Sequence, residues 1–234
     1  MTKARPKPPT FPATEITSPT PVILAVAILL LVRIQFPGAG SVSFDGGSYL
    51  TASSALLPTL AGDFTVSLWL KTGQSYGNPD DLAWQGAAII SADSPDPSAK
   101  DLLPVALTGG YVAFNVGAEG SDDTLNSSAA VNDNSWHHVV VTRQRSTGER
   151  QIYIDGVLDN SSTGTTELLN SPILLTIAGR RTLPILIPAS PDDTGSNGYE
   201  GSLDDIQIYD RVLSADEVSF LLQQSRNSNR WFQI

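Results

Sequence analysis

SWHHVVVTR at residues 135–143 and QIYIDG at residues 151–156 carry the clearest structural signal in the chain. The first segment is a run of β-branched residues behind Trp136, which is typical of a strand that is buried on at least one face. The second segment alternates apolar and polar residues and ends in Asp155-Gly156, a dipeptide that readily forms a type I′ turn. Because residues 146–149 supply turn residues between the two segments, we expect the segments to pair as an antiparallel hairpin.

These two segments resemble the laminin-G-like, concanavalin A-like jelly-roll domains of many secreted and surface proteins. Three further segments are similar to motifs of this family and follow in the family's order. They are an opening strand pair in SFDGGSYL (43–50), a central strand in GDFTVSLWLK (62–71), and a closing strand with a terminal helix in GSLDDIQIYDRVLSADEV (201–218). Within the last segment, Ser214 and Glu217 have the spacing of a capping box, which predicts the start of that helix.

The resemblance covers residues 41–224 and implies an all-β fold, an antiparallel β-sandwich of jelly-roll type with a short C-terminal helix. It implies no single activity, because lectins, glycanases, adhesion modules and spacers share this fold.

Length and charge limit the classes of function. The chain has 234 residues, enough for one sandwich with a sizeable core, and 41% of them are hydrophobic. A formal net charge of −10 argues against a nucleic-acid partner, because phosphate binding needs clustered Lys and Arg. The same charge is compatible with cation binding, with an extracytoplasmic surface or with a basic protein partner. The absence of cysteine excludes disulfides, thiolate metal sites and a cysteine nucleophile.

Two segments precede the sandwich. Residues 1–20 are a basic, Pro-rich arm, and residues 21–36 are hydrophobic, although their uncharged run is shorter than the roughly 20 residues of a full membrane span. Three interpretations of the hydrophobic segment remain open: a signal peptide cleaved at the small residues 38–40, an uncleaved signal anchor, and a buried part of the fold. We favour the anchor, a single transmembrane helix that contains Val22, Leu24, Ile28, Leu30 and Val32. The basic arm then places the N-terminus in the cytoplasm and the sandwich in the periplasm or outside the cell.

Catalysis finds little support in the sequence. The glycanases of this superfamily carry Glu-x-Asp-x-Glu on one strand, and the nearest approach here, residues 200–205, has no second Glu. His137 and His138 are the only histidines, and as neighbours on a strand they point to opposite faces and cannot bind one metal ion together. We therefore expect no enzymatic activity, and we expect one buried and one half-exposed structural histidine.

The resemblance also implies one candidate ion site. Some relatives hold a structural Ca²⁺ ion with an acidic residue near the closing strand and carbonyl oxygens near the opening turn. The matching positions are Asp204 or Asp205 with Asp45 and Gly46. The alternative is that Asp45-Gly46 is only a turn and that Asp204-Asp205 is a solvated strand edge. Apart from this Ca²⁺ ion, we expect no cofactor.

Two groups of apolar or aromatic residues are candidates for binding. The loop-rich stretches 73–86 and 92–102 look like additions to the family's fold. Loop aromatics could stack on sugars, and the candidates are Tyr76, Trp84 and Tyr199. An apolar loop between prolines and the aromatic tail at residues 225–234 indicate contact with a protein partner through Leu183, Ile185, Leu186, Ile187, Trp231 and Phe232. The alternative is that both segments pack against the sandwich itself.

Two functional hypotheses follow from these residues. The first is a non-catalytic, membrane-anchored extracytoplasmic interaction module, an accessory or scaffold subunit that holds a larger membrane protein complex together. The second is a secreted or surface carbohydrate-binding, lectin-like module. Copurification of stoichiometric partners would favour the first, and retention on a polysaccharide column would favour the second.

Overall fold

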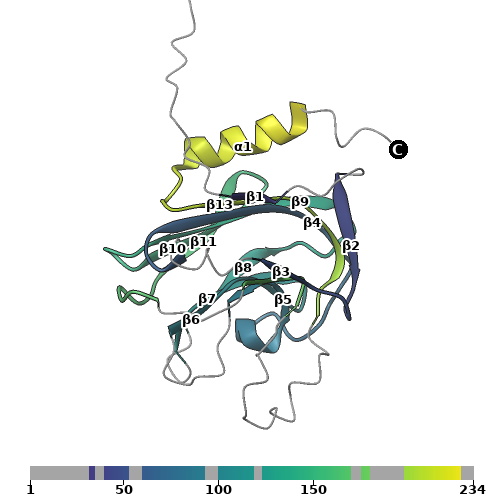
Figure 1. Cartoon of the computed structure of the whole chain (residues 1–234), viewed down its shortest axis with the longest axis horizontal. Coiled ribbons are helices and arrows are strands. Elements are labelled where there is room, and N and C mark those ends of the chain that lie inside the picture. Colours follow the sequence, from purple (N-terminus) through teal and green to yellow (C-terminus); the bar gives the residue numbers. More distant parts are fainter. Residues whose placement is uncertain are drawn as a thin grey trace, which may run out of the picture.

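Two antiparallel sheets pack face to face, and an α-helix lies over the outer face of one of them (Figure 1). The computed structural model describes residues 32–34, 40–52, 60–92, 100–118, 123–169, 175–179 and 198–227. Within these ranges the chain forms the antiparallel β-sandwich with a C-terminal helix that the sequence predicts.

Sheet A has the strand order β1-β13-β4-β9-β10-β11, and β2 pairs with β13 along the same edge as β1. Its strands are β1 (Val32–Ile34), β2 (Ser41–Asp45), β4 (Phe64–Lys71), β9 (Trp136–Gln144), β10 (Glu149–Ile154), β11 (Val157–Thr163) and β13 (Glu200–Tyr209). Sheet B has the order β3-β12-β5-β6-β7-β8. Its strands are β3 (Leu50–Ala52), β5 (Ala87–Ala92), β6 (Lys100–Thr108), β7 (Tyr111–Ala118), β8 (Thr124–Ala130) and β12 (Leu175–Ile177). The helix is α1 (Ala215–Asn227), and a short 3₁₀ helix, η2 (Ala83–Gln85), precedes β5.

The predicted hairpin is confirmed. β9 and β10 pair antiparallel, with Val141 opposite Ile152. At the end of β10, Asp155 (φ 51°) and Gly156 (φ 82°) both lie in the left-handed region, which is the backbone geometry of a type I′ turn. This turn leads into β11, which pairs with the other side of β10.

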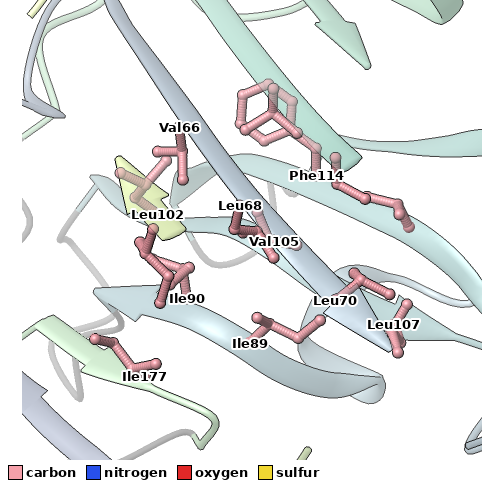
Figure 2. Packing of buried hydrophobic residues seen from close by; sticks show 14 of the residues in the cluster. Val66, Leu68, Leu70, Ile89, Ile90, Leu102, Val105, Leu107, Phe114 and Ile177 are labelled. Atoms are coloured by element: carbon pink, nitrogen blue, oxygen red, sulfur yellow. The ribbon is translucent and has the colours of Figure 1, made fainter. Parts of the chain in front are cut away.

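The core lies between the sheets and follows from strand alternation. Alternate residues of β4 are fully buried in it: Phe64, Val66, Leu68 and Leu70. Figure 2 shows three of these side chains beside core residues of β5, β6 and β7 in sheet B. Thr65, Ser67 and Trp69 lie on the opposite face of β4, as expected, and they are buried as well. Both faces of this central strand are therefore covered.

The outer face of sheet A is covered by α1. Val218 and Leu221 of the helix form a second apolar cluster with Val140, Tyr153 and Tyr209 of the sheet. The start of the helix is the predicted capping box. The backbone N–H of Ser214 donates to Glu217 Oε2 at 2.9 Å, and the backbone N–H of Glu217 donates to Ser214 Oγ at 3.3 Å.

The structure places Val32 in a strand rather than in the transmembrane helix that we expected. β1 pairs with β13, with Val32 opposite Ile208 and Ile34 opposite Ile206. Two β-branched residues in alternation suit a strand, and β1 supplies hydrogen-bond partners to an edge of β13 that would otherwise be open. The other predicted anchor residues, Val22, Leu24, Ile28 and Leu30, lie outside the described residues. Among the residues described, no helix has the length and apolar character that crossing a membrane requires.

The two histidines point to opposite faces of β9, and both have structural partners. His138 is buried, with Nε2 at 2.9 Å from Ser67 Oγ. The ring of His137 joins two loops, with Nδ1 at 2.9 Å from Asp155 Oδ2 and Nε2 at 3.1 Å from Asp133 Oδ1. Burial lowers the pKa of His137, but the hydrogen bonds to the two carboxylates outweigh this effect and raise the pKa above its ordinary value of 6.5.

Replacing Gly156 with Ala should destabilise the fold by about 1–3 kcal/mol, because a side chain is strained at positive φ. A Cβ atom there would also lie 2.8 Å from Leu222 Cδ2 of α1. Gly62→Ala is the matched control, since Gly62 lies outside the left-handed region and its Cβ would meet nothing within 4 Å. We expect Gly62→Ala to change the free energy of unfolding by less than about 1 kcal/mol. Urea denaturation measures both variants, and equal losses would contradict this account of the turn.

Stability should also depend on the protonation of His137. A histidine whose pKa is higher in the folded than in the unfolded state stabilises the fold in its charged form. That contribution is fully present below the unfolded value, near 6.5, and is lost as the pH rises through the folded pKa. We therefore expect the free energy of unfolding of the unmodified chain, relative to His137→Gln, to decline as the pH rises above about 6.5. Parallel pH curves for the two proteins would show that the carboxylates do not hold the charged ring.

Candidate functional site

A depression at one end of the sandwich is lined by Gly62, Asp63, Arg145, Ser146 and Thr166, and we call it the end pocket. It is open to solvent and has a volume of about 640 Å³. None of its residues was among the site residues predicted from the sequence.

The end pocket forms where the start of β4 meets the turn after β9 and the segment that follows β11. In the β4–β9 ladder Phe64 lies opposite Arg143, which brings the residues just beyond these two positions side by side. The backbone N–H of Arg145 donates to Asp63 Oδ1 at 2.7 Å. The side-chain Nε of Arg145 donates to the carbonyl oxygen of Thr166 at 3.1 Å. Hydrogen bonds thus connect all three segments around the pocket.

A buried arginine, Arg143, fixes two of these segments from the interior. Its Nη1 donates to the carbonyl oxygens of Ala61 and Gly62 at 3.2 and 2.9 Å. Its Nη2 donates to the carbonyl oxygens of Thr165 and Glu167 at 3.0 and 2.6 Å. Burial is the largest cause that lowers the pKa of Arg143 to about 10, so the group stays charged at neutral pH. The walls of the end pocket are therefore held in place before any ligand arrives.

Arg145 is the one basic residue among the five that line the end pocket. The side chain is exposed, and Nε is already bound to Thr166. Within the described part of the chain, no hydrogen bond or ion pair engages Nη1 or Nη2 of Arg145. A planar fork of this kind can donate two parallel hydrogen bonds to one carboxylate.

A third guanidinium, that of Arg150, lies close by. Arg150 is opposite Arg143 on β10, is buried, and places Nη2 2.7 Å from Asp123 Oδ2 and 2.8 Å from Ser162 Oγ. The positive charges of Arg145 and Arg150 contribute to lowering the pKa of Arg143. Three guanidinium groups therefore meet at this end of the sandwich, together with the carboxylates of Asp63 and Asp123.

The structure corrects the predicted role of Tyr199. The side chain is fully buried, with its ring centroid 6.5 Å from that of Phe44. Its hydroxyl lies 3.1 Å from the carbonyl oxygens of Lys71 and Ser202, and burial raises the pKa of this hydroxyl. A ring packed in the core cannot stack on a sugar.

The other two predicted sugar-binding aromatics lie in the segment between β4 and β5. Tyr76 is 38% exposed, so its ring remains accessible. Trp84 is half-buried and packs against Leu103, Ala106 and Ala113 on the outer face of sheet B. Tyr76 is therefore the member of the predicted set with the most accessible ring.

Two of the predicted calcium ligands, Asp45 and Asp204, lie apart in the structure. In the β2–β13 ladder Asp45 lies opposite Glu200 and Asp204 lies opposite Ser41. The two acids are therefore four positions apart, about 13 Å at about 3.3 Å per residue. Asp45 Oδ1 accepts hydrogen bonds from two backbone N–H groups of its own turn, and Asp204 and Asp205 are buried rather than solvated. Within the described ranges, no three acidic or histidine side chains gather as a metal site.

The predicted partner-binding residues cannot be placed. Leu183, Ile185, Leu186, Ile187, Trp231 and Phe232 lie outside the described residues. The one signal in the sequence for the end pocket was the clustering of Arg143, Arg145 and Arg150 around one turn of an acidic chain.

A family model described as the concanavalin A-like lectin/glucanases superfamily matches residues 44–219. Among curated proteins, the Rattus norvegicus protein "Sushi, von Willebrand factor type A, EGF and pentraxin domain-containing protein 1" is 27% identical over 171 residues. The match covers 71% of this chain and 4% of the rat protein, so the chain spans only a small part of that relative's length.

Solved structures of similar fold include the Ruminococcus gnavus IT-sialidase CBM40 bound to α2,3-sialyllactose. It has a TM-score of 0.61 at 14% identity, over 82% of this chain and 98% of that one. A botulinum neurotoxin type C structure, from a toxin whose cell entry depends on two ganglioside molecules, has a TM-score of 0.51 at 18% identity, over 75% of this chain and 39% of that one. At these identities the likeness shows the fold alone.

Proposed function

We propose that the chain, which belongs to the concanavalin A-like lectin/glucanase superfamily, is a non-catalytic module that binds a glycan in the end pocket. The observation that carries the proposal is the pocket itself, a prearranged and solvent-open depression with polar groups on several sides. The structural likeness to a sialyllactose-bound module and to a toxin that interacts with gangliosides supports it.

The lining of the end pocket suits a sugar. Ser146 and Thr166 carry hydroxyl groups that can both donate and accept hydrogen bonds, Asp63 can accept them and Arg145 can donate them. Sugar hydroxyls need such a mixture of donors and acceptors at fixed positions.

The same lining argues against hydrolysis of the bound glycan. Asp63 is the single carboxylate among the five residues that line the end pocket. Glycoside hydrolysis generally needs two carboxyl groups, about 5–5.5 Å apart in retaining enzymes and about 6.5–9.5 Å apart in inverting ones. The proposed activity is therefore binding.

A second candidate function, contact with another protein subunit, has its own support. Val157 (69% exposed) and Leu158 (48% exposed) begin β11, and Phe220 (48% exposed) lies on α1, which contacts β11. Exposed apolar side chains on neighbouring elements are common where proteins meet. This surface could serve the membrane-associated scaffold role that the hydrophobic segment at residues 21–36 suggests, with the sandwich outside the cytoplasm.

Filling the end pocket should abolish glycan binding. Gly62→Trp adds a large side chain to the lining at a position where a Cβ meets nothing within 4 Å, so the backbone need not move. We expect this variant to lose at least about tenfold in affinity for every glycan that the unmodified chain retains on an array.

Gly47→Trp is the control for that experiment. Gly47 is exposed, and its Cβ would have its nearest neighbour at 3.7 Å. Gly47 follows β2, whose Asp45 lies opposite Glu200. Glu200 is at the end of sheet A where β4 finishes, and the end pocket is where β4 begins. Gly47 is therefore far from the end pocket. Binding that survives Gly62→Trp but fails in Gly47→Trp would place the glycan elsewhere.

The hydrophobic segment should be retained in the native protein, because it contains β1, which pairs with β13. Intact mass, measured on protein extracted with and without detergent, tests this. We expect the full-length mass, recovered with detergent and together with any stoichiometric partner. A mass that begins near Ser41, recovered without detergent, would instead identify residues 1–40 as a cleaved leader and remove β1 from the native sheet.

A further inference from the structure

We infer that the glycan of the end pocket is an acidic sugar whose carboxylate is bound by Arg145. This inference rests on the proposed function and specifies the class of ligand. Three features of the end pocket lead to it: the state of the Arg145 guanidinium, the rigidity of the walls, and the absence of an aromatic side chain among the five lining residues.

The guanidinium of Arg145 is oriented but not neutralised. Its Nε bond to the carbonyl oxygen of Thr166 orients the side chain, and the backbone bond to Asp63 holds the turn that carries it. Asp63 Oδ1 accepts a hydrogen bond from the backbone N–H of Arg145, and no ion pair joins the two side chains in the described structure. The two terminal nitrogens of Arg145 therefore remain as paired donors for an anion, which is the geometry that a carboxylate matches.

The rigid walls reduce the cost of binding. Four backbone carbonyls from both sides of the end pocket are already bound to Arg143, so a ligand does not have to order these segments. Binding sites that are ordered in advance lose less conformational entropy when the ligand arrives.

The composition of the lining also favours an acidic sugar over a neutral one. The local charges are mixed: Arg143, Arg145 and Arg150 influence one another, Asp63 also acts on Arg143, and Asp123 forms an ion pair with Arg150. Direct contact with Arg145, and not the charge of the whole region, would therefore select the anion. A neutral sugar would gain more from an aromatic platform, and none of the five lining residues is aromatic.

The test compares ligands that differ only in charge. Titration calorimetry of the full-length chain would use α2,3-sialyllactose, a glucuronate-terminated oligosaccharide and the methyl ester of each. We expect at least one of the two acids to bind at least about tenfold more tightly than its own ester, and this preference to weaken with added salt. Preference for sialyllactose or for the glucuronate ligand would identify the source of the carboxylate.

Two variants separate the role of Arg145 from general electrostatics. Arg145→Gln should remove the preference for the acid, whereas Arg145→Lys should keep part of it. Lys71→Gln is the matched control, since it removes one positive charge from an exposed side chain at the far end of β4. We expect this control to keep the preference.

The outcomes distinguish this inference from the proposed function. If acid and ester bind equally, or if Arg145→Gln keeps the preference, the inference is wrong. The proposed function would then still stand, provided that Gly62→Trp abolishes binding. If no glycan binds to the unmodified chain, both are wrong.

Discussion

The apolar contact between the two sheets is the interaction on which the rest of the structure depends. It buries alternate residues of β4, and the other face of that strand is buried as well. At the ends of the strands this contact stops, and backbone carbonyls of the connecting segments need hydrogen-bond donors. Arg143 supplies four such bonds at one end. The end pocket lies directly outside this closure, so the group that completes the core also fixes the shape of the candidate site.

The features that the sequence predicts correctly are those that depend on neighbouring residues. Asp155-Gly156 determines a turn by its own backbone preferences, and alternation along β9 assigns His137 and His138 to opposite faces. The capping box at Ser214 and Glu217 is likewise local. Such signals, together with the resemblance to a known family, were enough to predict the sandwich and its closing helix.

The features that the sequence did not predict depend on contacts between distant segments. Tyr199 lies next to a glycine in a polar stretch, yet packing against Phe44 buries it. Asp45 and Asp204 are separated by the register of β2 on β13, which no local pattern reveals. The end pocket is assembled from three segments, and only the register of β4 on β9 brings them together. Fold class can be derived from local signals. A site that forms where several loops meet can be predicted only when the register of the paired strands is known.

The pairing of β1 with β13 has a mechanical consequence. The ladder is antiparallel, and Val32, at the start of β1, lies opposite Ile208, near the end of β13. Tension applied to the chain from residues before β1 and after β13 therefore acts at the same end of this ladder. Because the hydrogen bonds lie across the strands, the pull opens them one after another instead of loading them all together. Under such a force the module would yield first at this edge, by peeling, while the sheet-to-sheet contact and the end pocket stay intact.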